Sequence, residues 1–160
     1  MPIEVASVSW DDPAAVALRA AQREEIDARY GADTEPGPKP TADDIVVFLV
    51  ASRDGEPVGC GGLRAIDAEH GEIKRMYVVP AARGSGVAVA VLRALEAEAR
   101  DRGWTRLVLE TGVEQPDAIR FYTREGYTPI PSFGHYIDSP ISRCFDRRLE
   151  PRVDPAVGGA

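Results

Sequence analysis

A glycine-flanked turn at the start of a long helical pattern is the part of the sequence whose residue types best suit chemistry. It consists of Arg83-Gly84-Ser85-Gly86, and the apolar periodicity of a helix begins directly after it, at Val87. Free amides at a helix start bind anions, helped by the helix dipole, and glycines let a phosphate approach the backbone closely. Arg83 adds a positive charge at the same place. The turn therefore suits a pyrophosphate, and the alternative is a tight surface turn with a solvated arginine.

Two common phosphate-binding loops do not match this turn. No Gly-Lys-Ser/Thr follows it, so it is not a Walker loop. It also lacks the third glycine and the distant acidic residue of a dinucleotide-binding fold. Nothing in the sequence resembles a metal site or a Ser/His/Asp catalytic set, so we expect no bound metal.

Composition limits the class of protein that carries this turn. The chain has 160 residues, with 44% apolar and 28% charged types, which indicates one soluble globular domain. Its formal charge of −7 argues against a nucleic-acid-binding surface. The longest apolar run, Ile45–Ala51, is far shorter than the roughly 20 residues of a membrane helix. Cys60 and Cys144 lie outside any metal-ligand spacing, so we expect buried, reduced thiols in a cytoplasmic protein.

The elements that must position the turn follow a mixed α/β order. We expect helices at 13–30, 84–102 and 116–125, and strands at 3–9, 45–51, 57–66, 72–79, 105–110, 127–130 and 141–149. The strands between 45 and 79 should form an antiparallel meander, whereas the strand–helix–strand segment 72–110 should make two parallel strands. The Pro/Gly-rich loop 31–41 is long for a connector, which is typical of a functional or mobile segment. Residues 1–150 form the expected domain, and 151–160 a frayed, disordered tail.

The spacing of apolar residues in the strand before the turn predicts a β-bulge. Ile73, Met76 and Val78 are three and then two residues apart, whereas a regular strand keeps a spacing of two. One extra residue between positions 74 and 76 would put all three on the core face. The alternative is a strand buried on both faces, which would bury the charges of Lys74 and Arg75 in the core.

Three motifs, in this order, resemble those of the GCN5-related N-acetyltransferase (GNAT) family, over residues 43–149. The first is similar to the family's central strand, and the second fits its cofactor motif of Arg or Gln, two residues, Gly, one residue, and Gly or Ala. The third fits Ala-x-x-Phe-Tyr-x-x-x-Gly-Tyr. The matching residues are Glu72 to Pro80, then Arg83, Gly86 and Ala88, then Ala118, Phe121, Tyr122, Gly126 and Tyr127.

The resemblance implies a fold and a cofactor. The fold would be α/β of the α+β kind: a mixed, mostly antiparallel twisted sheet of six to seven strands, with flanking helices and a splayed parallel strand pair. Acetyl-CoA would be the acyl donor, with its pyrophosphate on the turn and its pantetheine arm along the central strand. The implied cofactor-binding residues are Met76, Tyr77, Val78, Arg83, Gly84, Ser85, Gly86, Val87 and Ala88.

Acetyl transfer to an amine needs a base for the ammonium group and an acid for the departing thiolate. The resemblance matches Tyr122 to the family's general-acid tyrosine, although the ring could serve packing alone. It matches Glu72 to the position of a general-base glutamate, which often acts through water. Glu110, at the end of the partner strand, is the rival base, and ordered waters are a third possibility.

The expected acceptor is the primary amine of a small metabolite, with an amino acid as one candidate. Arg64, Lys74 and Arg75 could hold a carboxylate there, unless they pair with neighbouring acids. An ordered loop at 31–41 over the site would favour a small molecule, whereas an open groove would suit a protein lysine or N-terminal acetyltransferase. A noncatalytic acyl-CoA sensor is the alternative of another class, and Tyr122 together with Glu72 speaks against it. We expect a monomer or homodimer with no nucleic-acid or membrane partner.

Overall fold

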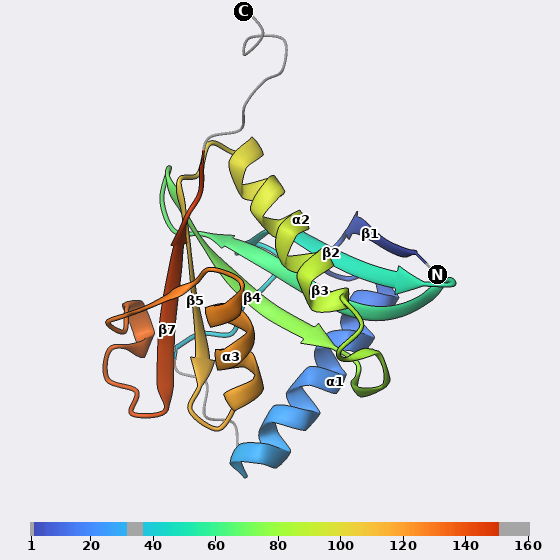
Figure 1. Ribbon diagram of the computed structural model, residues 1–160, viewed down its shortest axis with the longest axis horizontal. Coiled ribbons are helices and arrows are strands. Elements are labelled where there is room, and N and C mark those ends of the chain that lie inside the picture. Colours follow the sequence, from blue (N-terminus) through green and yellow to red (C-terminus); the bar gives the residue numbers. More distant parts are fainter. Residues whose placement is uncertain (1, 32–36, 151–160) are drawn as a thin grey trace, which may run out of the picture.

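A seven-stranded sheet forms the centre of the molecule, in the order β1-β2-β3-β4-β5-β7-β6 (Figure 1). The structure is a computed structural model that describes residues 2–31 and 37–150. Part of the loop predicted at 31–41 and the whole tail predicted at 151–160 therefore lie outside the described residues. The strands are β1 (Ile3–Val8), β2 (Ile45–Arg53), β3 (Glu56–Ala65), β4 (His70–Val78), β5 (Arg106–Gly112), β6 (Thr128–Ile130) and β7 (Ser142–Arg148). The helices are α1 (Pro13–Tyr30), α2 (Val87–Asp101) and α3 (Pro116–Arg124), with short 3-10 turns at Pro80–Ala82 and Gly134–Tyr136.

One parallel strand pair interrupts an otherwise antiparallel sheet. β4 and β5 pair in parallel from His70↔Arg106 to Glu72↔Val108, and no further pair joins them among the described residues. Beyond Glu72 and Val108 the two strands separate, which confirms the mixed sheet with a splayed parallel pair. The separation leaves the edge of β4 without a neighbouring strand on that side.

The structure corrects the predicted start of β4. We expected this strand to begin at residue 72, but His70 and Gly71 already belong to it, and Gly71 pairs with Ala65 of β3. A Cβ at Gly71 would overlap the ring of Trp104. This glycine therefore allows a close approach in the sheet rather than a turn.

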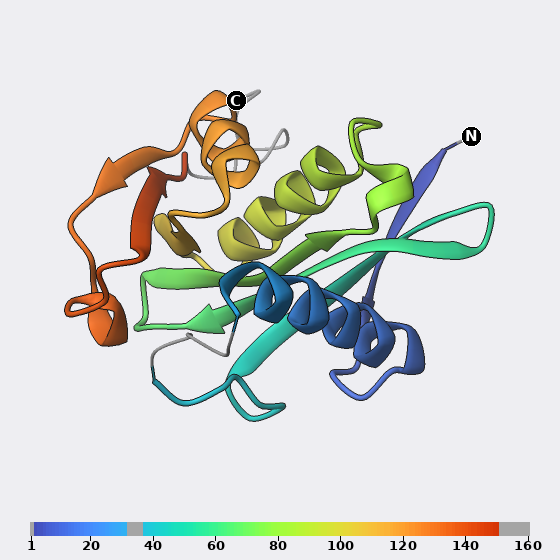
Figure 2. The same cartoon turned by 90° about the horizontal axis from the view of Figure 1, so that it is seen from below.

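Helices cover both faces of the sheet, with α1 on one face and α2 and α3 on the other (Figure 2). β2 lies between two apolar cores, as its continuous apolar run predicts. Its residues Val47, Leu49 and Ala51 belong to the core under α2, whereas Phe48 and Val50 belong to the core under α1.

The predicted bulge in β4 is present. Lys74 pairs with Gly62 and Tyr77 pairs with Cys60, so that three steps along β4 match two steps along β3. Arg75 lies inside the bulge with φ of 60°, in the left-handed region. A non-glycine residue adopts this conformation only where the surroundings hold it there.

The bulge resets the side-chain alternation of β4, as the apolar spacing predicts. Ile73, Met76 and Val78 all pack on the core under α2, and Tyr77 belongs to the core under α1. The strand can therefore bury its apolar residues without carrying its two cations into the same core. None of the described helices is both long and apolar enough to span a membrane.

Candidate active site

Two adjoining cavities open beside the separated strands. The larger, which we call the long groove, has a volume of about 320 Å³ and follows the end of β4 to the start of α2. The smaller, which we call the cleft, has a volume of about 130 Å³ and lies between β4 and β5. Their shared wall joins them into one site, and it consists of Gln22, Ile26, Met76, Gln115, Ala118 and Tyr122.

The glycine turn before α2 forms one end of the long groove. Gly84 and Gly86 have φ of 76° and 91°, and this left-handed backbone delays the start of α2 to Val87, three residues later than we expected. Gly86 is the N-cap and gives no side-chain capping bond. The amides at this helix start are therefore available to an anion in the groove, which Gly84, Gly86 and Ala88 line.

Two residues of the predicted cofactor set do not line the groove. The Ser85 hydroxyl donates to the Ala82 carbonyl, and Arg53 donates to Ser85 at 3.1 and 3.2 Å. Val87 is fully buried in the core under α2. Both residues therefore shape the turn with their side chains, and only their backbone could contact a ligand.

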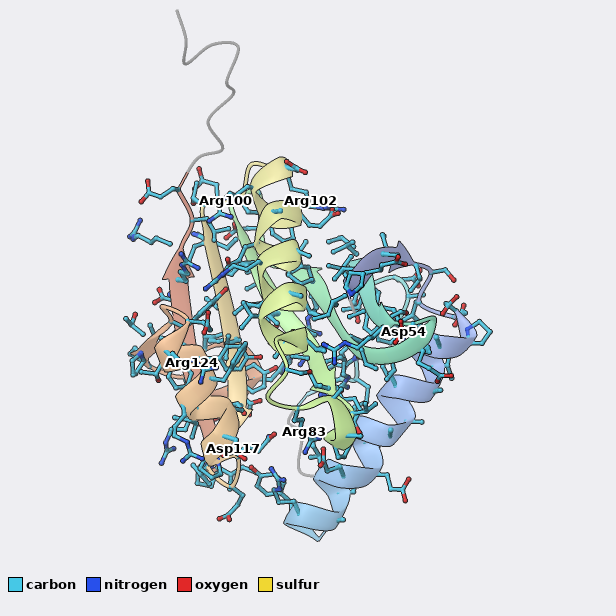
Figure 3. The ribbon with its side chains drawn as sticks, turned by 45° about the vertical axis from the view of Figure 1, so that its right-hand side comes forward. Asp54, Arg83, Arg100, Arg102, Asp117 and Arg124 are labelled. Atoms are coloured by element: carbon cyan, nitrogen blue, oxygen red, sulfur yellow. The ribbon has the colours of Figure 1, made fainter. Side chains whose placement is uncertain are left out.

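Arg83 lies between α1 and the start of α2, and it lines the groove with an acidic partner (Figure 3). Its Nη2 donates to Glu25 Oε2 at 2.8 Å, and its Nε donates to the Val78 carbonyl at 2.9 Å. The hydrogen bond that Arg83 donates to Glu25 raises the pKa of Arg83. The guanidinium lies 5.7 Å from the centre of the Tyr77 ring. An anion in the groove would have to replace Glu25 as the partner of Arg83.

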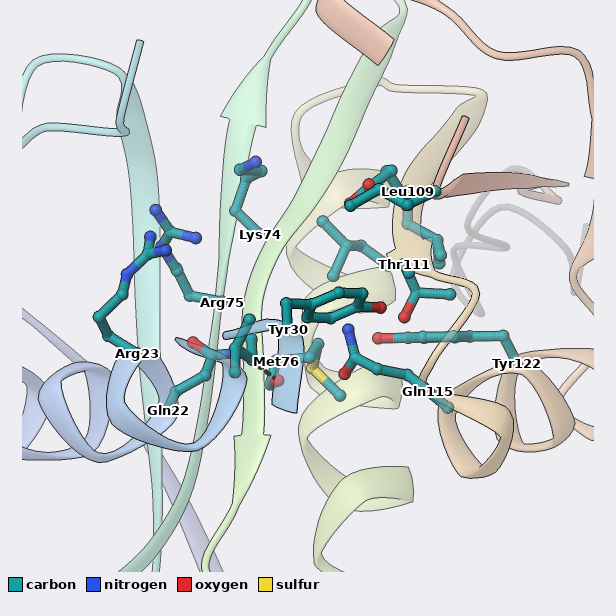
Figure 4. A pocket seen from close by; sticks show the side chains of 16 residues that line it. Gln22, Arg23, Tyr30, Lys74, Arg75, Met76, Leu109, Thr111, Gln115 and Tyr122 are labelled. Atoms are coloured by element: carbon teal, nitrogen blue, oxygen red, sulfur yellow. Dashed lines mark hydrogen bonds between the residues drawn. The ribbon is translucent and has the colours of Figure 1, made fainter. Parts of the chain in front are cut away.

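Tyr122 of α3 stands where the groove and the cleft meet. Its ring packs edge-on against Phe121 and Tyr127, with centroid distances of 5.1 and 5.8 Å. Its hydroxyl makes no hydrogen bond with the described residues and points into the cleft (Figure 4). Burial raises the pKa of Tyr122 above the ordinary value of a tyrosine, at which the hydroxyl is already protonated at neutral pH.

Side chains from α1 and β3 hold the backbone of the bulge. Gln22 Nε2 donates to the Met76 carbonyl at 2.8 Å, and Cys60 Sγ donates to the Arg75 carbonyl at 3.3 Å. Gln22 Oε1 is buried and has no hydrogen-bond partner among the described residues. The sequence prediction missed Gln22, although its spacing of four with Ile26 and Tyr30 marks one face of the helix.

Glu72, the predicted base, is a residue of β4. Its side chain lies in a buried polar cluster and lines neither cavity. Its side chain is only 5% exposed, and its Oε1 accepts from Arg64 Nη2 at 3.2 Å. Its Oε2 accepts from the Tyr136 hydroxyl at 2.8 Å, and that hydroxyl accepts from Lys74 Nζ at 2.8 Å. Arg64 therefore pairs with a neighbouring acid, which is the alternative to its binding a carboxylate of the acceptor. Lys74 lines the cleft as well.

The rival carboxylate, Glu110 of β5, does line the cleft. The Ser142 hydroxyl donates to its Oε2 at 2.6 Å. Arg75, Thr111 and Tyr30 line the same cleft (Figure 4). Of the two carboxylates considered as bases, the structure therefore brings Glu110 rather than Glu72 to the cavity beside Tyr122.

Comparisons with known proteins agree with this arrangement. The sequence model described as "Acetyltransferase (GNAT) family" matches residues 10–127. The chain is 44% identical to an IAA acetyltransferase of Azospirillum brasilense over 104 residues, 64% of this chain and 67% of the relative. It is 38% identical to an aminoalkylphosphonate N-acetyltransferase of Salmonella typhimurium over 90 residues, 53% of this chain and 58% of the relative.

A solved structure gives the same assignment. A proposed acyl-CoA N-acyltransferase from Klebsiella pneumoniae superposes with a TM-score of 0.79 at 32% identity, over 92% of this chain and 98% of the other. The motifs, the splayed sheet and these likenesses agree with one another. The chain belongs to the GNAT family of acetyltransferases and uses acetyl-CoA as its acyl donor.

Proposed function

We propose that this enzyme transfers the acetyl group of acetyl-CoA to the primary amine of a small metabolite, and that residues 1–150 form its single catalytic domain. The observation that carries this proposal is the meeting of the long groove and the cleft at Tyr122. The groove would hold the cofactor and the cleft the acceptor, with the reacting atoms at the shared wall. Bound acetyl-CoA supplies an activated acyl group as a thioester.

The residues around the long groove fit the cofactor. A Cβ at Gly84 would meet no atom within 4 Å, so the left-handed backbone there faces open space that a phosphate can enter. Arg83 would exchange Glu25 for the pyrophosphate, which is the better partner because it carries more charge. The pantetheine arm would run beside Met76 to Val78, where β4 lacks a neighbouring strand beyond its pairing with β5.

Tyr122 is the proposed general acid. A tyrosine hydroxyl is protonated at neutral pH, burial raises the pKa of Tyr122 further, and the hydroxyl points into the cleft (Figure 4). From there it would donate to the sulfur that leaves the acetyl group. A hydroxyl that makes no hydrogen bond with the described residues can give its proton without breaking a structural contact.

Glu110 is the proposed general base, and the assignment of Glu72 stays an untested prediction. The Glu72 carboxylate is closed off by Arg64 and Tyr136, so an acceptor amine could reach it only through Lys74 or a water. Glu110 borders the cleft directly. A carboxylate at this position would take the proton of the acceptor ammonium, either by contact or through one water.

The size of the cleft favours a small acceptor over a protein. Its volume of about 130 Å³ is below the several hundred Å³ of typical pockets for drug-sized ligands. The aminoalkylphosphonate acetyltransferase named above also acts, by its name, on a small amine. A peptide acceptor is the second candidate of the same reaction class.

Release of the CoA thiol in the presence of candidate acceptors tests the proposal. The panel contains small primary amines, free amino acids and lysine-containing peptides, each at saturating acetyl-CoA. We expect thiol release with small amines and none above background with peptides. Release confined to peptides would contradict the small-acceptor proposal, and binding of acetyl-CoA without release for any acceptor would indicate a sensor.

A further inference from the structure

Helix α1 bridges the two separated strands at the cleft. Toward β4, Gln22 Nε2 donates to the Met76 carbonyl at 2.8 Å. Eight residues later, at the end of the helix, Tyr30 reaches the end of β5. Eight residues span about 12 Å along an α-helix. The helix therefore crosses the opening that forms where β4 and β5 no longer pair, beyond Glu72 and Val108.

The contact between Tyr30 and β5 requires a glycine. A Cβ at Gly112 would overlap the hydroxyl of Tyr30 and the ring carbon that carries it. Gly112 does not have a positive φ, so this glycine serves the close approach rather than a turn. The amide of Glu114 donates to the Tyr30 hydroxyl at 3.1 Å. The far end of the ring is thus held both by β5 and by the loop that follows it.

The Tyr30 ring is a wall of the cleft and not of the long groove. Tyr30 and Gly112 both line the cleft, and neither lines the groove. The ring lies across the cleft, with its hydroxyl directed to the side of β5 (Figure 4). Because the cleft has a volume of only about 130 Å³, the position of this ring determines much of the space that an acceptor can occupy.

A wall of this kind resists a longer acceptor. To make room, the ring would have to leave the backbone of Gly112 and break its hydrogen bond with Glu114. Closely packed groups relax only in part, so an added methylene strains a site that cannot move aside. In enzyme pockets, one methylene changes kcat/KM by about tenfold to two-hundredfold.

We infer that Tyr30 is a specificity-determining residue that sets the upper limit on the length of the acceptor. This inference rests on the proposed function and defines the size class of its substrate. The acceptor amine lies at the shared wall beside Tyr122, and the rest of the molecule extends toward the Tyr30 ring. Amines that end before the ring are accepted, and longer ones are excluded. The Tyr30 hydroxyl fixes the ring and takes no part in the chemistry.

Two homologous series of amines measure this length limit, with release of the CoA thiol as the assay. One series contains unbranched alkylamines from ethylamine to octylamine, and the other contains ω-amino acids from β-alanine to 6-aminohexanoate. The ammonium pKa is nearly constant along the alkylamines, so a fall in kcat/KM reports on fit rather than on free-amine concentration. We expect kcat/KM to fall at least about tenfold within one or two added carbons.

Substitutions at Tyr30 separate the wall from the hydroxyl. Tyr30→Ala removes the ring and should raise kcat/KM for the first excluded homologue at least about tenfold, relative to that for the shortest substrate. Tyr30→Leu leaves a smaller apolar side chain and should shift the limit in the same direction, which guards against loss of fold in the alanine variant. Tyr30→Phe keeps the ring and should keep the length limit of the parent.

Ala28→Gly is the matched control. Ala28 is an exposed residue in the same last turns of α1, and it lines neither cavity. Glycine weakens a helix without changing the wall of the cleft. This variant should therefore keep the length limit, which distinguishes removal of the ring from loosening of the helix end.

The outcomes separate this inference from the proposed function. Similar kcat/KM for every homologue with the parent, a limit unchanged in Tyr30→Ala and Tyr30→Leu, or an equal shift in Ala28→Gly overturns the wall while acetyl transfer to small amines stands. Absence of thiol release with every small amine overturns the proposed function and the wall together. Acetyl-CoA binding, measured by calorimetry, should be the same in all variants. Its loss in both Tyr30→Ala and Tyr30→Leu would show that the ring supports the whole site, and would overturn the inference.

Discussion

Replacement of Tyr122 by phenylalanine separates chemistry from packing at the junction of the two cavities. The change removes one oxygen atom and keeps the ring between Phe121 and Tyr127. Because the hydroxyl makes no hydrogen bond with the described residues, its loss leaves no partner unsatisfied. The free energy of unfolding should therefore change by no more than about 0.5 kcal/mol.

The effect on turnover should be much larger than the effect on stability. General acid–base catalysis typically contributes roughly a hundredfold to ten-thousandfold, which corresponds to about 2.7 to 5.5 kcal/mol of barrier. We expect kcat of the Tyr122→Phe enzyme to fall by at least about tenfold, since water can replace part of the proton donation. Affinity for acetyl-CoA should stay within about twofold, because the ring that lines the groove remains.

Tyr127→Phe is the matched control for this experiment. The Tyr127 hydroxyl donates to buried Glu96 at 2.8 Å and lines neither cavity. Its removal should cost about 1–3 kcal/mol of stability, measured by urea unfolding, and leave kcat close to that of the parent. Tyr122→Phe should therefore lower turnover and keep stability, whereas Tyr127→Phe should lower stability and keep turnover. Parental turnover in Tyr122→Phe would refute the general-acid assignment.

Three further outcomes follow from contacts around the site. Glu25→Gln frees Arg83 and should tighten acetyl-CoA binding by up to about fivefold, whereas Arg83→Gln should weaken it at least about tenfold, both by calorimetry. In Gly112→Ala, the new Cβ would overlap the Tyr30 hydroxyl, so KM for the acceptor should rise while acetyl-CoA binding stays the same. Burial raises the pKa of Cys60 to about 12, so between pH 9 and 12 the unfolded chain loses a proton that the folded chain keeps. The free energy of unfolding should therefore fall by up to about 1.4 kcal/mol per pH unit in that range, and Cys60→Ala should flatten the fall in urea unfolding at pH 8 and 10.5.

Local periodicity was sufficient to predict the parts of the fold that a few neighbouring residues determine. The unbroken apolar run of β2 predicted burial on both faces, and the uneven spacing of Ile73, Met76 and Val78 predicted the bulge. Both signals lie within ten residues of sequence. The glycine turn was found in the same way, because its left-handed glycines and the helix after it are adjacent in the chain.

Contacts between distant segments explain what the sequence could not predict. The family resemblance matches Glu72 to the position of a general base, but Tyr136, 64 residues later, closes its carboxylate off from the cleft. Gln22 holds the bulge from 54 residues away, and no local pattern connects the two. The sequence did not predict Gly71 as part of β4, because its packing partner, Trp104, lies far along the chain, between α2 and β5.

The extra residue in β4 decides on which face of the sheet Arg75 lies. Without it, the alternation that starts at Ile73 would point Arg75 and Tyr77 into the apolar core under α2. An unpaired guanidinium in that core would cost several kcal/mol, whereas a left-handed backbone at one residue costs about 1–3 kcal/mol. The sequence therefore favours the bulge, and the bulge carries Arg75 to the α1 face, where Arg23 and the cleft are. The bulge therefore lets β4 bury its apolar residues while Arg75 lies at the cleft, outside the core under α2.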